Sequence, residues 1–138
     1  MEPMKSRDTL IRLKRFHVDE KRRRVMQIET MIAEFDRMAV DLDREIAAEE
    51  QKAGISVLAH FAYPTYAKAA RTRRDNLKRS ADELKGQLQD AQAELGEAFE
   101  ALKKVEILDN RERSAERLAE NAREQAAMNE LGLARARA

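Results

Sequence analysis

The amino-acid sequence predicts an all-α fold, a long antiparallel two-helix coiled-coil hairpin, on three observations. Nine positions in the second half of the chain are all apolar, with spacings that alternate between four and three residues. Their average spacing of 3.5 residues is the period of a left-handed coiled coil. A matching stripe recurs every seven residues in the first half, and the composition (38% charged, 4% aromatic) is typical of long helices. The first stripe is Met4, Ile11, Val18, Val25, Ile32, Ala39, Ile46 and Ala53, completed between Val25 and Ile46 by Ile28, Phe35 and Leu42. The second is Leu77, Ala81, Leu84, Leu88, Ala91, Leu95, Ala98, Leu102 and Val105.

The distribution of charge favours an antiparallel hairpin over a parallel dimer. Net charges of +5, −5, +4 and −3 fall on residues 1–25, 26–62, 63–86 and 87–138 in turn. Folding the chain back near residue 58 sets blocks of opposite sign beside each other, whereas a parallel dimer stacks blocks of like sign. In this register residue i faces roughly residue 116 − i, so Ile28 is expected to meet Leu88 and Ile32 to meet Leu84.

Proline, glycine and capping residues set the expected ends of the helices. Asp8 is a good N-cap for the first helix, and Gly54 is suited to its C-terminal stop. Pro64 is tolerated in the first turn of a second helix, which Gly132 should end. The predicted layout is one coiled-coil domain over residues 1–138, with helix one at about 6–52, a turn at 53–63, helix two at about 64–131 and a tail at 132–138.

The apolar heptads of the second helix stop after Val105. The next core positions are Asp109, Glu112 and Glu116, so the heptad phase is expected to fail there. Residues after about 113 have no opposite helix, and their surface is free for another protein. A shifted apolar stripe is expected to replace the first one: Leu108, Ala115, Leu118 and Ala122.

No sequence feature predicts an enzyme, a cofactor or a metal site. The chain has no cysteine. Each of its two histidines, His17 and His60, is the only histidine in its neighbourhood, and Glu20, one turn after His17, does not by itself make a metal site. Nucleic-acid binding is not expected, because the partner helix supplies acid opposite the basic runs at 22–24 and 71–79. No apolar run approaches the ~20 residues of a membrane span, so direct membrane insertion is not expected.

Apolar residues crowd the expected turn. Three of the six aromatic side chains, Phe61, Tyr63 and Tyr66, fall within six residues, next to three aliphatic ones. They either close the hairpin by packing on each other or form a docking surface. The aliphatic residues are Ile55, Val57 and Leu58.

Three stretches resemble the FliJ family of flagellar type III export chaperones, most of all its alphaproteobacterial branch. The turn and the start of helix two are one such stretch, and two further stretches lie in helix two. Together with the two-helix pattern, the resemblance covers nearly the whole chain. Its residues are Ala59, Tyr63, Pro64, Tyr66, Arg71, Asp75, Asn76 and Leu77; Ala98, Phe99, Glu100, Lys103, Lys104, Val105 and Glu106; and Leu118, Ala119, Glu120, Asn121, Gln125, Met128, Asn129 and Glu130.

The resemblance implies a non-enzymatic part of the flagellar export apparatus, a stalk-like rod of two helices. Such a rod binds the hexameric export ATPase, promotes ring assembly and activity, contacts the membrane export gate protein and cycles export chaperones. It implies a cytoplasmic protein, peripheral at the inner membrane, that we expect to be a monomer when free. The implied ATPase-binding residues are Arg7, Leu10, Leu13, Leu118, Asn121, Gln125 and Met128. The implied gate-binding residues are Tyr63, Tyr66, Ala70 and Arg73.

Other classes of function stay open at this point. One is a structural coiled-coil module with no role in secretion, such as a homodimer. Another is the equivalent stalk of a virulence type III secretion system. A helical hairpin that binds nucleic acid is a third, weaker alternative.

Overall fold

The computed structural model describes residues 6–137 and has two helices, α1 (Ser6–Ala53) and α2 (Val57–Arg137). No strand occurs within this range. The predicted fold class, an antiparallel two-helix coiled-coil hairpin, is confirmed. Met4 and Ala138, which figure in the sequence-based expectations, lie outside the described residues.

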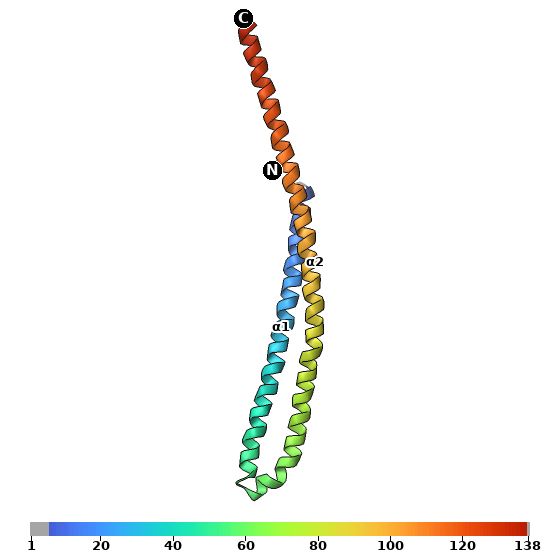
Figure 1. Cartoon of the computed structure of the whole chain (residues 1–138), viewed down its shortest axis with the longest axis vertical. Coiled ribbons are helices and arrows are strands. Elements are labelled where there is room, and N and C mark those ends of the chain that lie inside the picture. Colours follow the sequence, from blue (N-terminus) through green and yellow to red (C-terminus); the bar gives the residue numbers. More distant parts are fainter. Residues whose placement is uncertain (1–5, 138) are drawn as a thin grey trace. The chain divides into compact units, whose positions relative to one another are not determined.

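The contacts between α1 and α2 divide into two compact units. One consists of the residues up to Val18 together with those from Glu97 onward, and the other is the segment from Asp19 to Gly96. Within the second unit, Figure 1 shows α1 and α2 running side by side from the turn that joins them. The expected single domain stays a prediction.

The second unit is held together by an apolar seam between the helices. Its centre is formed by the buried side chains of Val25, Ile28, Leu84 and Ala91. Four further residues of the predicted stripes pack against this centre, namely Ile32, Phe35, Leu88 and Leu95. The heptad positions on both helices therefore face each other, as their spacing predicts.

Ion pairs across the seam agree with the predicted register. Lys21 Nζ lies 3.1 Å from Glu94 Oε2, and Arg74 Nη1 lies 2.8 Å from Asp43 Oδ1. The residue numbers of each pair add to within one of 116. The hydrogen bond from Arg74 lowers the pKa of the Asp43 carboxyl, so the charged form is favoured in the folded chain.

The turn is shorter than predicted, and α2 begins at Val57 rather than near Pro64. Ser56 caps the helix: its carbonyl oxygen accepts a hydrogen bond from the His60 amide at 2.9 Å, and its Oγ accepts one from the Ala59 amide at 3.4 Å. Pro64 consequently lies inside the helix, where its missing N–H leaves the His60 carbonyl without its usual donor. The prediction misjudged the start because it gave the proline more weight than the serine.

The predicted tail at 132–138 is also wrong for its described part, because α2 runs through Gly132 to Arg137. None of the described glycines has a positive φ, so Gly132 does not adopt the left-handed conformation of a C-terminal stop. The alternating Ala and Arg residues that follow are strong helix formers. Local propensity therefore continues the helix where a glycine alone indicated its end.

Replacing Ile28 by Ala should lower the free energy of unfolding by about 3 kcal/mol. Ile28 is only 1% exposed and lies at the centre of the seam, so truncation leaves a cavity between the helices. Urea unfolding followed by circular dichroism measures the change. Met26→Ala, at a site that is 60% exposed on the same helix, is the matched control and should change stability by less than about 0.5 kcal/mol. Equal effects of the two substitutions would contradict the seam.

Candidate partner-binding surfaces

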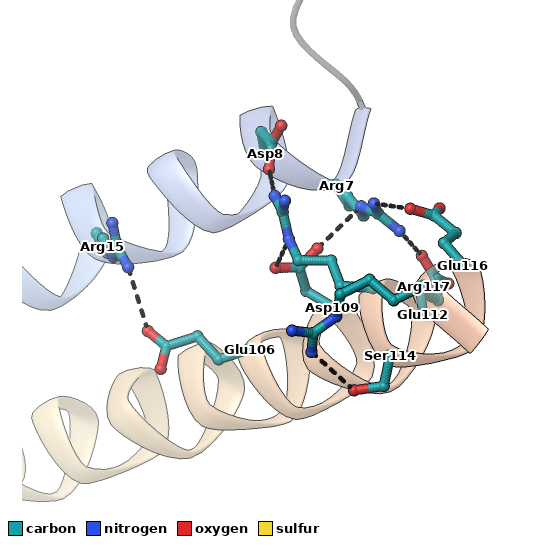
Figure 2. A network of polar contacts seen from close by, with 10 residues as sticks. Arg7, Asp8, Arg15, Glu106, Asp109, Glu112, Ser114, Glu116 and Arg117 are labelled. Atoms are coloured by element: carbon teal, nitrogen blue, oxygen red, sulfur yellow. Dashed lines mark hydrogen bonds and ion pairs between the residues drawn. The ribbon is translucent and has the colours of Figure 1, made fainter. Parts of the chain in front are cut away.

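The beginning of α1 is fastened to α2 by Arg7, which contacts three carboxylates (Figure 2). Its Nε lies 2.9 Å from Asp109 Oδ1, its Nη1 2.8 Å from Glu112 Oε2 and its Nη2 3.1 Å from Glu116 Oε2. The Arg7 side chain is only 15% exposed. Hydrogen bonds to Glu116 and Glu112 raise the pKa of the guanidinium above its ordinary value, so Arg7 stays charged at any physiological pH.

The heptad phase does not fail at Asp109, contrary to the sequence-based expectation. Asp109 continues the four-three spacing from Val105 and is a buried residue, only 8% exposed. The core position is occupied by a charged side chain because its partner, Arg7, supplies the opposite charge across the seam. The shifted stripe does not replace the first one within the chain, since Leu108 and Leu118 are 56% and 70% exposed.

A second arginine completes the network. Arg113 Nε lies 2.9 Å from Asp109 Oδ2, and its Nη2 lies 2.8 Å from Asp8 Oδ1 on α1. The Asp109 carboxylate is thus shared by Arg7 and Arg113, one from each helix. The hydrogen bond to Asp109 raises the pKa of Arg113. We call this network the ionic clamp; its residues are Arg7, Asp8, Asp109, Glu112, Arg113 and Glu116.

The implied ATPase-binding residues fall into two groups in the structure. On α1, Arg7 is engaged in the ionic clamp, whereas Leu10 and Leu13 are 42% and 49% exposed. On α2, every described residue from 110 to 137 is exposed. This segment holds the other four implied residues: Leu118, Asn121, Gln125 and Met128.

The exposed segment of α2 carries large apolar side chains that no described part of the chain covers. Leu118 and Met128 are 70% and 65% exposed, and Leu133 is 56% exposed. Charged residues of both signs separate them along the helix. A single helix of this kind is suited to packing against helices of another protein.

The implied gate-binding residues lie on α2 close to the turn, but only some of them are accessible. Tyr66 is half-buried and its hydroxyl donates to Glu45 Oε2 at 3.4 Å; burial and the negative charge of Glu45 raise its pKa. Ala70 is buried against α1, only 7% exposed. Arg73 is exposed and borders a small hollow between the helices, together with Met38, Asp41, Leu42, Glu45 and Leu77.

The aliphatic and aromatic side chains around the turn do not bury one another. Ile55, Val57, Leu58 and Phe61 are 89%, 75%, 84% and 78% exposed, which disfavours the expectation that they close the hairpin by packing. Tyr63 is half-buried, and its hydroxyl has no hydrogen-bond partner within the described residues. The four exposed side chains, which we call the apolar tip, fit the docking-surface alternative.

Sequence reasoning missed several residues that these surfaces contain. Arg113 was not singled out, and Asp109 was interpreted as the end of the heptad phase, although an acid at a heptad core position opposite an arginine is a readable signal for an interhelical ion pair. Phe16 was also missed; it is 53% exposed on α1, one turn after Leu13. Its spacing from Leu10 and Leu13 sets the three on one face of α1.

The described residues contain no group of three or more His, Asp or Glu side chains that could hold a metal ion. Within the same residues, no helix is long and apolar enough to cross a membrane.

Replacing Arg7 by Gln should release the first turns of α1 from α2. The substitution leaves Asp109 buried without its partner, so backbone amides of residues 8–14 should exchange hydrogen at least about tenfold faster. Hydrogen–deuterium exchange with mass spectrometry measures this. Arg12→Gln, an equal loss of charge at an exposed position one turn away, is the control and should leave exchange unchanged. Identical exchange in the two variants would mean that the clamp does not hold α1.

Comparison with known proteins agrees with this architecture. The family model described as "Flagellar FliJ protein" matches residues 4–138, which include both helices, the turn and the exposed end of α2. No curated protein and no solved structure matches the chain. The match over nearly the whole length, together with the two-helix hairpin, shows that the chain belongs to the FliJ family and is a non-catalytic component of flagellar type III export.

Proposed function

We propose that the chain binds the hexameric flagellar export ATPase through its paired helix ends, promotes assembly of the ring and raises its ATP turnover. The observation that carries this proposal is the exposed stretch of α2 from 110 to 137, with Leu118 and Met128 uncovered. Leu10 and Leu13 on α1 add a second exposed apolar surface in the same unit.

The ionic clamp has a defined part in this proposal. Arg7 is surrounded by carboxylates of its own chain, so it is poorly suited to bind an external partner as well. Its part is to hold the start of α1 on α2. Leu10 and Leu13, one to two turns later, are thereby presented in a fixed register.

The activating mechanism needs no catalytic group in this chain. A partner that binds the assembled or active form of the ring more tightly than the free subunits shifts the equilibrium toward that form. The shift is limited by the difference between the two affinities. Packing of uncovered leucine and methionine side chains against ATPase helices supplies such a difference, because it occurs only where the subunits are assembled.

A double substitution in the exposed segment tests the proposal. Leu118→Asp with Met128→Asp should raise the concentration needed for half-maximal stimulation of the export ATPase from the same genome by at least about tenfold, since two apolar contacts are lost. Both sites are exposed, so helicity by circular dichroism should be unchanged. Met26→Asp with Met38→Asp, on an exposed part of α1 in the other unit, is the control. Full stimulation by the Leu118 and Met128 variant would overturn the proposal.

We propose further that the accessible residues at the start of α2 contact the export gate protein. Arg73 is exposed and lines a shallow concave face together with Thr65, Lys68, Ala69, Thr72 and Asn76, and the half-buried Tyr66 lies on the same part of α2. Tyr63 is half-buried, and Ala70 is buried. Ala70 therefore contributes by allowing close helix packing, not by touching the gate.

A charge reversal at Arg73 tests the gate contact. Arg73→Glu should weaken binding to the cytoplasmic domain of the gate protein by about tenfold, because it replaces a cation by an anion on the proposed face. Isothermal titration calorimetry measures the affinity. Arg71→Glu makes the same change on the opposite side of α2 and should have little effect. Equal losses in both variants would indicate general electrostatics and not this face.

The remaining assignments rest on the resemblance seen in the sequence and are proposals for this chain. They are the cycling of export chaperones, a cytoplasmic location at the periphery of the inner membrane, a monomeric free state and descent from the alphaproteobacterial branch. The family match favours flagellar export over a virulence system and over a structural module with no secretion role. Light scattering measures the molar mass of the free protein and so tests whether it is a monomer. A stable parallel dimer would contradict the proposed monomeric state.

A further inference from the structure

The apolar tip lies in a long stretch of sequence without charged residues, which includes the turn. Between Lys52 and Lys68 the sequence contains no Asp, Glu, Lys or Arg. Four large apolar side chains in this stretch, Ile55, Val57, Leu58 and Phe61, are each at least 75% exposed. Contact of large apolar side chains with water raises the free energy of the folded chain, and all four of these side chains lie within seven consecutive residues.

The chemistry of the tip changes in a fixed order away from the turn. The apolar side chains come first, at the turn itself and on the first two turns of α2. The half-buried Tyr63 and Tyr66 follow, and the exposed Lys52 and Lys68 flank the whole on the two helices. Along α2 the order is therefore apolar side chains, then tyrosines, then Lys68, which is also the order found from the acyl chains to the headgroups of a bilayer interface.

The arrangement of the apolar groups favours lipid over a protein groove. Val57, Leu58 and Phe61 share one face of α2, as expected from their spacing. Ile55 lies outside that face, in the turn between the helices, where its amide donates to the Lys52 carbonyl at 3.1 Å. A groove that receives one helix face leaves Ile55 uncovered, whereas lipid chains surround a protruding turn on every side.

We propose that the apolar tip inserts into the boundary between headgroups and acyl chains of a phospholipid bilayer, with Lys52 and Lys68 near the lipid phosphates. In this proposal the tip binds at the bilayer interface and does not cross the membrane. For the tip, the proposal replaces the sequence-based expectation that the chain does not insert into a membrane. Lys52 also pairs with Glu49 at 3.3 Å, which weakens its attraction for anionic lipid. The apolar groups therefore dominate, and anionic lipid strengthens binding only a fewfold.

A single tryptophan reports insertion directly, because the natural chain has none. The full-length Phe61→Trp chain is titrated with vesicles of phosphatidylcholine alone and with 30% phosphatidylglycerol. The indole emission of this variant should shift to shorter wavelength with both, at lower lipid concentration for the anionic vesicles. Emission that stays at the wavelength of water-exposed indole at saturating lipid would overturn the proposal.

Cosedimentation with the same vesicles tests which residues are responsible. Leu58→Gln with Phe61→Gln should lower the fraction bound by at least about tenfold. The matched control, Leu118→Gln with Met128→Gln, alters two side chains of similar exposure and should bind vesicles as the natural chain does. Equal binding of both variants would overturn the proposal, as would protection of the tip by the gate protein without any binding to vesicles.

The outcome is independent of the proposed ATPase interaction. The Leu58 and Phe61 variant should stimulate the ATPase normally, whereas the Leu118 variants should not. For the Leu58 and Phe61 variant, loss of vesicle binding with intact stimulation supports the lipid proposal. Intact vesicle binding with intact stimulation contradicts the lipid proposal and leaves the ATPase proposal standing.

Discussion

The fold depends on one narrow constraint, namely that each helix has a single partner and can bury only one stripe of side chains against it. Among the described residues, Ile28 is the only large side chain that is almost fully enclosed, and many of the other buried positions are alanines. Small residues such as Ala39, Ala81 and Ala91 let the helices approach, and larger neighbours such as Leu84 fill the space between them. The free energy of packing is therefore spread along the seam, with no thick core to concentrate it.

In the other unit, the first turn of α1 is held by charges and not by apolar packing. At the start of α1 the apolar residues give way to Arg7, and the opposing core position is Asp109. An ion pair at such a position adds less stability than a leucine pair, since both charges lose water. It does, however, fix the register, because a shift of one helix along the other leaves Asp109 without a cation. We interpret the clamp mainly as a device for register.

The sequence was sufficient to predict most of the fold, because the heptad spacing reflects the packing of the seam directly. Ile28, Leu84 and Leu88 lie where the spacing puts them. The helix ends were harder to predict, because no periodic pattern marks them. A single residue such as Ser56 or Gly132 competes there with the helix propensity of its neighbours. At the proposed surfaces, spacing alone could not show that Arg7 is sequestered, that Ala70 is buried or that Leu58 and Phe61 remain exposed, because these depend on contacts across the seam.

The same constraint explains why exposed apolar groups in this chain are informative. In a globular domain an exposed leucine is ordinary, because the surface has to include apolar atoms. A two-helix seam makes exposure still more common, so a single residue such as Met26 carries no meaning. Exposed apolar residues mean more where their whole surroundings are unusual: Leu118 and Met128 lie on a segment with no covering helix among the described residues, and Leu58 and Phe61 lie in a stretch without charge. At neither place does the described part of the chain offer a second layer that could bury them, so what covers them has to come from outside it.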